Sequence, residues 1–248
     1  MNTRRTSRMA AAAVLVSVLA ACAMPAAREA PVPAERYRAL LADPIRTDRD
    51  RRMDEARRPV ELLQFAQVRP GMQVLDVATG AGYTSQLLAL AVAPNGKLWA
   101  QTPQPGAALN ERMAAHPQPN FIVTKRPFDD PIPPEAAPLD LVTLILNYHD
   151  ISYLPVDRDA MNRRIFAALK PGGRYVIVDH SALAGTGITA GKTLHRIEEA
   201  FVVAEVKRAG FALDGEGAFM RNAGDTREGS SNNATPPSDK FALRFVKP

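Results

Sequence analysis

The chain has 248 residues and a formal net charge of +5, from 31 lysines and arginines against 26 aspartates and glutamates. Three of the arginines lie in the first 21 residues, which hold no acidic residue, so the rest of the chain has 28 basic and 26 acidic groups. This near balance excludes the strong positive charge typical of nucleic-acid binding, and no nucleic-acid partner is expected. The single cysteine, Cys22, excludes an intrachain disulfide.

The first 21 residues predict a signal peptide. Three arginines are followed by an apolar stretch, residues 9–20, that is too short to span a bilayer comfortably. Residues 19–22, Leu-Ala-Ala-Cys, resemble the lipobox of bacterial lipoproteins, which implies removal of residues 1–21 and a lipid on Cys22. The alternative is an ordinary N-terminal helix with a buried cysteine.

The segment at 22–34 is rich in alanine and proline and is expected to be a tether between the lipid and the folded part. A lipid at Cys22 would hold the protein to a membrane of the bacterial envelope. By resemblance to known lipoproteins, Ala23 after the cysteine implies the periplasmic side of the outer membrane.

Residues 35–248 are expected to form one α/β domain, because strand-like and helix-like segments alternate along them. N-terminal helices occupy 35–70 and the sheet core occupies 71–248. Strands are predicted at 74–77, 97–101, 120–124, 139–146, 174–179, 211–219 and 240–246. Helices are predicted at 36–41, 49–65, 83–93, 106–115, 155–169 and 191–209. This alternation favours a Rossmann-like, doubly wound sheet of about seven strands, mostly parallel, with helices on both faces.

The helices ahead of the sheet core are rich in arginine. The second, at 49–65, is interrupted at Pro59, and Met53, Val60 and Leu63 recur in it at helical spacing. Its arginines are interpreted as a solvated face, and the two helices as a lid beside the sheet.

The first strand and the turn after it carry the clearest functional signal. Val74, Leu75 and Val77 predict a buried parallel strand. Gly80 and Gly82 allow the backbone to turn sharply and to approach a ligand where a Cβ would clash. The helix that follows directs its N-terminal N–H groups toward the same crevice, so a nucleotide-type pocket is expected there.

This turn resembles motif I of the class I S-adenosylmethionine (SAM)-dependent methyltransferases, whose acidic residue and small residues are matched by Asp76, Ala78, Gly80 and Gly82. Residues 169–179, Leu-Lys-Pro-Gly-Gly-Arg-Tyr-Val-Ile-Val-Asp, resemble the turn into strand five of that family. The resemblance covers the chain from about residue 60 onward. It implies an antiparallel last strand, SAM as the cofactor, and methyl transfer to a small-molecule substrate.

The resemblance also implies where SAM binds. In the family this loop holds the amino-acid end and the ribose, so the expected contacts of the loop are Asp76, Ala78, Gly80, Gly82 and Tyr83. The family has an acid at the end of strand two that binds both ribose hydroxyls. Here that strand ends in Gln101, which can hydrogen-bond a hydroxyl but lacks the charge. Asp129, or alternatively Asp130, near the adenine and Asn147 after strand four complete the expected set.

Catalytic residues are expected where the fourth and fifth strands end. The sequence Tyr148-His149-Asp150 follows the fourth strand, which is the family's position beside the transferred methyl group. His149 is predicted to act as a general base, oriented by Asp150. His180, at the end of the fifth strand, or Tyr148 is predicted to position the acceptor.

A metal site is an alternative prediction. His195 and Glu199 are four residues apart in a predicted helix and hence on one face, where they could also form a plain ion pair. Together with His149 and His180 they offer imidazole and carboxylate ligands, which suit zinc, iron or nickel. The same histidines resemble those of a bacterial group of predicted secreted methyltransferases.

A third interpretation is a non-catalytic envelope lipoprotein with this fold that binds a nucleoside-like or other ligand, because fold alone does not establish function. The polar loop at 222–239 is expected either to fold over a substrate or to be disordered.

Overall fold

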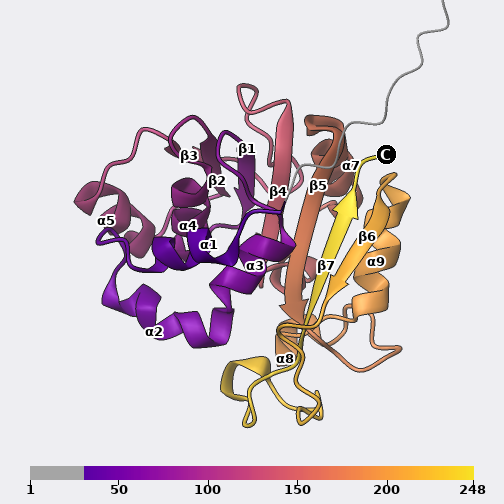
Figure 1. Cartoon of the computed structure of the whole chain (residues 1–248). Coiled ribbons are helices and arrows are strands. Elements are labelled where there is room, and N and C mark those ends of the chain that lie inside the picture. The colour runs from indigo at the N-terminus through magenta and orange to yellow at the C-terminus, as the bar shows by residue number, and fades with distance from the viewer. Residues whose placement is uncertain (1–30) are drawn as a thin grey trace, which may run out of the picture. The chain divides into compact units, whose positions relative to one another are not determined.

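A sheet of seven strands forms the centre of the computed structural model of the protein, which describes residues 31–248 (Figure 1). The strands are β1 (Gln73–Val77), β2 (Lys97–Thr102), β3 (Phe121–Lys125), β4 (Leu139–Ile145), β5 (Leu169–His180), β6 (Ala212–Gly217) and β7 (Lys240–Val246). The predicted signal peptide and the predicted lipidation site, Cys22, lie outside the described residues.

The strand order is β3-β2-β1-β4-β5-β7-β6. Strands β1 to β5 are parallel, whereas β7 lies between β5 and β6 and runs antiparallel to both. The chain fills one half of the sheet from β1 outward to β3 and then returns to place β4 on the other side of β1. This reversal opens a crevice at the carboxyl ends of β1 and β4, where ligands bind in such sheets. The predicted Rossmann-like class, with an antiparallel last strand, is confirmed.

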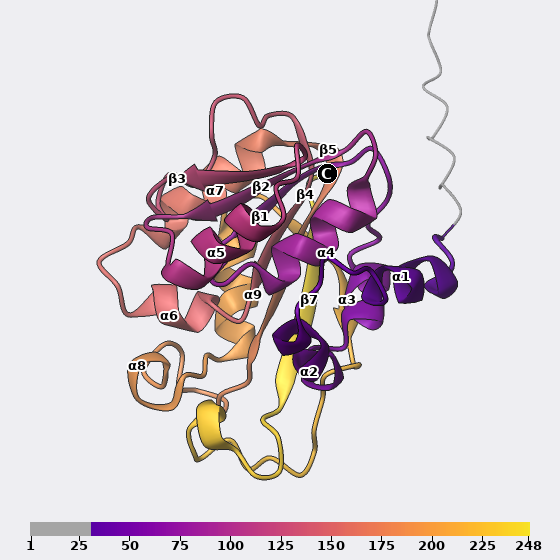
Figure 2. The ribbon, with the colours of Figure 1, turned by 90° about the vertical axis from the view of Figure 1, so that its left-hand side faces the viewer.

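Helices cover both faces of the sheet (Figure 2). They are α1 (Ala34–Leu41), α2 (Asp48–Arg57), α3 (Pro59–Phe65), α4 (Tyr83–Val92), α5 (Ala107–Ala115), α6 (Tyr148–Ser152), α7 (Arg158–Ala168), α8 (Gly191–Leu194) and α9 (Glu199–Arg208). In β1, Val74 packs among side chains of α1, α3 and α4, whereas Leu75 and Val77 pack among those of α7 and α9. Burial on both faces explains why the strand is almost entirely apolar. None of these helices in residues 31–248 is both long and apolar enough to cross a membrane.

The prediction of one continuous helix over residues 191–209 is wrong, because the chain leaves the helix in the middle of this range. The chain instead forms α8 and α9, and between them His195 adopts a left-handed conformation with φ 50°. Ile197 pairs with Ser181, just beyond the end of β5, so its backbone groups bond to the sheet and not within a helix. His195 and Glu199 therefore do not share a helix face.

The polar loop at 222–239 is folded and includes a short 3-10 helix at Ser231–Asn233. The buried guanidinium of Arg196 donates two hydrogen bonds to Asp225, at 2.8 and 3.1 Å. Arg196 also donates to the carbonyl of Ser181, at 3.0 Å. The loop is thereby tied to the end of β5.

Candidate functional site

The turn after β1 leaves an open cavity at the carboxyl edge of the sheet. Ala78, Gly80 and Gly82 have φ angles of 59°, 57° and 83°, which turn the chain sharply out of the strand. A cavity of about 240 Å³ lies against this turn, and we call it the glycine-loop cavity. Its lining includes Asp76, Ala78, Gly80, Tyr83, Arg57 and Asn147. A Cβ placed on Gly80 would meet no atom within 4 Å, so a long side chain there would extend into free space that a ligand needs.

Asp76 is buried beneath the turn and holds it in shape. Its two carboxylate oxygens accept hydrogen bonds from Ser85 Oγ, at 2.5 Å, and from Thr143 Oγ1, at 2.6 Å. Ser85 also shares a hydrogen bond with Thr79 in the turn itself. Burial raises the pKa of Asp76 to about 6, and the two hydroxyl hydrogen bonds offset only part of that effect.

Helix α2 forms one wall of the cavity and is fastened to the turn. The Tyr83 hydroxyl donates to Asp54 at 2.7 Å. Asp50 accepts two hydrogen bonds from the guanidinium of Arg112, at 2.7 and 2.9 Å. The same guanidinium donates to the carbonyl of Ala81 at 2.9 Å, so α2, α5 and the glycine turn are joined.

One arginine of α2 departs from the predicted solvated face. Four others in this region, Arg49, Arg51, Arg52 and Arg58, are exposed. Arg57 instead lines the cavity, with its guanidinium 5.8 Å from the centre of the Tyr83 ring. Burial lowers the pKa of Arg57, and no carboxylate of residues 31–248 pairs with it. The cavity therefore contains a cation with room for an anionic ligand group.

Three of the predicted cofactor contacts do not line this cavity. Gly82 faces α5 instead, since a Cβ there would lie 3.0 Å from side-chain atoms of Leu109 and Arg112. Gln101 is fully buried. Its side-chain Oε1 accepts a hydrogen bond from Ala78 N at 3.0 Å, and its side-chain Nε2 donates one to Arg126 O at 2.6 Å. Gln101 thus braces the backbone and exposes no surface to a ribose. Asp129 is half-buried in the connection between β3 and β4 and is not among the residues that line the cavity. Asn147 does line it, and donates to the carbonyl of Ala78 at 3.2 Å.

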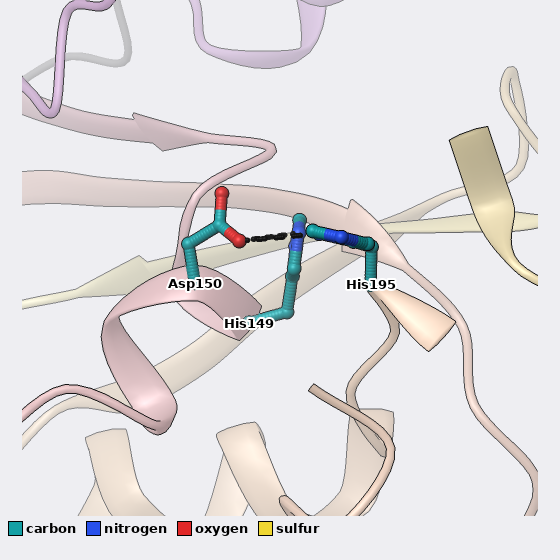
Figure 3. Close-up of side chains that lie close together, drawn as sticks. All are labelled: His149, Asp150 and His195. Atoms are coloured by element: carbon teal, nitrogen blue, oxygen red, sulfur yellow. Dashed lines mark hydrogen bonds and ion pairs between the residues drawn. The ribbon is translucent and has the colours of Figure 1, made fainter. Parts of the chain in front are cut away.

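A second constellation follows β4 and β5, and Figure 3 shows three of its side chains converging. His149 lies in α6, its Nδ1 is 2.6 Å from Asp179 Oδ1 at the end of β5, and its Nε2 is 3.2 Å from Asp150 Oδ1. His195 reaches the same Asp150 oxygen with Nδ1, at 3.3 Å. We call His149, Asp150, Asp179 and His195 the histidine cluster.

The carboxylates determine the protonation of the cluster. Burial alone would lower the pKa of His149, but the hydrogen bonds to Asp150 and Asp179 outweigh it and raise that pKa to about 9. Burial would raise the pKa of Asp150, yet the hydrogen bond and charge of His149 lower it to about 2. In this geometry His149 holds its proton at neutral pH, which is the opposite of what the predicted general base requires.

The other two predicted catalytic residues have different environments. The Tyr148 hydroxyl is fully buried, donates to Glu205 at 2.9 Å and accepts from Asn162 at 2.9 Å, so it faces the core beneath α6. His180 lies beside the cluster, with its ring centre 5.7 Å from that of His149 and its Nδ1 2.8 Å from Ser238 Oγ. Burial, followed by nearby positive charges, lowers the pKa of His180 to about 3, so it is neutral at physiological pH.

The structure also changes the predicted metal-ligand set. Ligand atoms of His149, Asp150 and His195 all lie within 4.8 Å of one another. Two predicted ligands are not in this group: the Nδ1 of His180 bonds to Ser238, and the carboxylate of Glu199 pairs with Arg221 at 2.6 Å.

Sequence reasoning did not select two residues that the structure places in these sites, Asp179 and Arg57. Asp179 is fully buried at the end of β5, and its position directly before His180 is the sequence signal that could have identified it. Arg57 had no distinguishing signal among its neighbouring arginines.

Solved structures share this arrangement of sheet and helices. A SAM-dependent methyltransferase from Aquifex aeolicus has a TM-score of 0.58 and 18% identity, over 88% of this chain and 100% of that one. One from Mesorhizobium loti has a TM-score of 0.54 and 16% identity, over 77% and 97%. A glycopeptide N-methyltransferase complexed with sinefungin has a TM-score of 0.56 and 16% identity, over 79% and 86%. No model of a known protein family matches the sequence. At such low identity these likenesses establish the fold, and this chain has the Rossmann-like methyltransferase fold.

Proposed function

We propose that the protein binds SAM in the glycine-loop cavity and transfers its methyl group to a small-molecule acceptor. The observation that carries this proposal is the turn of Ala78, Gly80 and Gly82, which opens at the carboxyl ends of β1 and β4. Arg57 supports it, because SAM carries a carboxylate and this guanidinium has no acidic partner in residues 31–248. The solved structures of the same fold support the choice of cofactor.

The acceptor is proposed to bind between the cavity and the histidine cluster. Asn147 lines the cavity, and His149 follows it two residues later, in α6. His149 is the side chain proposed to contact the acceptor, with Asp179 and Asp150 orienting its ring and His180 beside it. Tyr148 is given no contact with the acceptor, because its hydroxyl lies in the core.

We also propose that the protein is exported and anchored by a lipid on Cys22, on the periplasmic side of the outer membrane. The lipobox-like sequence before Cys22 supports this location. Replacing the cysteine, Cys22→Ser, is expected to abolish incorporation of labelled fatty acid into the protein. No label in the wild-type protein, or equal labelling of the variant, would refute the lipid anchor.

One observation favours a second function, ligand binding without methyl transfer. The ribose position at the end of β2 has no acid, and the Gln101 amide that replaces it is bonded to backbone groups. A SAM site with weakened ribose contacts is compatible with an envelope binding protein that uses the same cavity for a nucleoside-like ligand.

Calorimetric titration of SAM into the purified protein tests the proposal. Gly80→Asp is expected to abolish micromolar binding, because the carboxylate occupies the cavity and repels the carboxylate of SAM. Gly172→Asp is the matched control, since Gly172 also has a positive φ and an unobstructed Cβ position but lies outside the cavity. No binding at millimolar SAM, or equal binding by Gly80→Asp, would refute the SAM site. Binding without transfer to any acceptor would favour the second function.

A further inference from the structure

We propose that His149, Asp150 and His195 bind one divalent transition-metal ion of the zinc class, with a fourth position open to water or to a ligand oxygen. Two imidazole nitrogens and one carboxylate oxygen form the ligand set of many catalytic zinc sites. Imidazole ligands favour such ions over magnesium or calcium, which prefer oxygen. The inference does not rest on SAM binding, because none of the three residues lines the glycine-loop cavity.

Two of the three distances between the ligand atoms match a tetrahedral ion. Asp150 Oδ1 is 3.2 Å from His149 Nε2 and 3.3 Å from His195 Nδ1. Two ligand atoms about 2.0–2.1 Å from one ion, at the tetrahedral angle, are about 3.3–3.4 Å apart. The ligand atoms of the two histidines lie within 4.8 Å of each other, so binding an ion requires at most that the two rings move closer together. Figure 3 shows that the three side chains point toward a common point from two separate segments.

Asp179 orients the first of these ligands. Its Oδ1 lies 2.6 Å from His149 Nδ1, and its other oxygen accepts from His149 N at 2.9 Å. It also accepts from His180 N at 2.7 Å, so the buried carboxylate is held in place. Zinc binding displaces the proton that His149 Nε2 shares with Asp150 in the metal-free protein, and Nδ1 keeps its proton against Asp179. The lone pair of Nε2 then faces Asp150 and His195. A carboxylate behind a histidine ligand is the usual support of a zinc site.

The backbone at both ends of the site adopts conformations that are costly for residues other than glycine. Leu146, just before α6, has φ 59°, and His195 has φ 50°. The carbonyl of His195 is held by Ser231 Oγ, at 2.8 Å. Such strain persists where the surrounding structure enforces a functional geometry. Here it directs the imidazole of His195 toward Asp150 from the break between α8 and α9.

Equilibrium dialysis of the full-length protein against Zn²⁺, followed by metal quantification, tests this site. We expect one Zn²⁺ per chain. His195→Ala is expected to weaken binding at least 10-fold, and because His195 is partly exposed the variant should still fold. Asp179→Asn is expected to weaken binding about 10- to 100-fold. The control is His116→Ala, which removes the exposed histidine at the end of α5 and should leave binding unchanged.

Each variant is also combined with Cys22→Ser and measured again, so that the cysteine thiol does not supply a metal ligand. Failure of the wild-type protein to bind Zn²⁺ stoichiometrically at tens of micromolar would overturn the proposal. Equal binding by His195→Ala and the wild-type protein would also overturn it. Zinc binding without SAM binding would support the metal site and refute only the proposed methyl transfer.

Discussion

The glycine-loop cavity and the histidine cluster lie at the same edge of the sheet but are assembled in different ways. One side of the cavity is a continuous stretch, Asp76 to Thr84, that forms the end of a strand, a turn and the start of a helix, and the other sides come from α2, Arg112 and residues 145–147. The cluster joins three segments: Asp179 is 30 residues from its partner His149 in the sequence, and His195 is 45 residues from its partner Asp150. Local sequence therefore determines the glycine turn of the first site, whereas the second site has no such local part and depends throughout on the packing of α6, β5 and α8. A variant in one site should therefore change the properties of that site and leave those of the other unchanged.

The largest expected difference between the two sites follows from removing the side chain of His149. His149→Ala is expected to lower the rate of methyl transfer about 10²- to 10⁴-fold, the range for a positioned proton donor or acceptor. The dissociation constant of SAM should stay unchanged, because His149 does not line the glycine-loop cavity. Single-turnover rates and calorimetric titration measure the two quantities, with His116→Ala as the control. An unchanged rate would remove His149 from the chemistry.

The next effect concerns the core beneath the cluster. Arg158 makes two hydrogen bonds to the buried Glu205, at 2.9 and 3.0 Å, and Glu205 also accepts from Tyr148 in α6. Arg158→Ala leaves a buried carboxylate without its main partner and is expected to lower the free energy of unfolding by about 3 kcal/mol. Arg208, an exposed arginine 3.5 Å from the same Glu205, is the matched control. Arg208→Ala should cost less than about 1 kcal/mol. Urea unfolding of both variants measures the difference, and equal costs would contradict the argument.

Asp76 gives a pH-dependent effect in the cavity region. Its pKa is raised from 3.8 to about 6 in the folded protein, so the folded state binds more protons than the unfolded state between these values. The free energy of unfolding therefore falls as pH rises through this window, by about 3 kcal/mol for two pKa units. Asp76→Asn should remove this fall and be more stable than the wild type at pH 7 by about 1–3 kcal/mol. Urea unfolding at pH 4 and pH 7 tests this, and parallel pH profiles would show that the expected shift is absent.

The smallest effect concerns the wall of the cavity. Tyr83→Phe removes the hydrogen bond to Asp54 on α2 and is expected to cost about 1 kcal/mol of stability and to weaken SAM binding. Zinc binding should not change. Tyr153→Phe is the counterpart in the cluster, since the exposed Tyr153 donates to Asp150 at 2.8 Å. It should leave SAM binding intact, and a similar loss of SAM affinity in both variants would show that the two sites are not independent.

The contrast between the sites also explains what the sequence could predict. The sheet follows from alternating apolar segments, and the turn at Gly80 follows from residues adjacent in sequence. The break at His195 was missed, because it depends on pairing of Ile197 with Ser181, a tertiary contact that overrides helical spacing. The role of Gln101 was also not predictable, since its backbone partners come from two different loops.

Helix α6 has only five residues, and the side chains of two adjacent ones contact different parts of the structure. Tyr148 anchors the helix in the interior through its hydroxyl, which donates to Glu205, and His149 belongs to the histidine cluster at the edge of the sheet. A protein engineer can therefore treat Asp150 and His195, which are partly exposed, as replaceable positions around a fixed His149. Exchanging them for cysteine or glutamate would alter which metal ion the proposed site prefers, while Tyr148 keeps α6 anchored in the core.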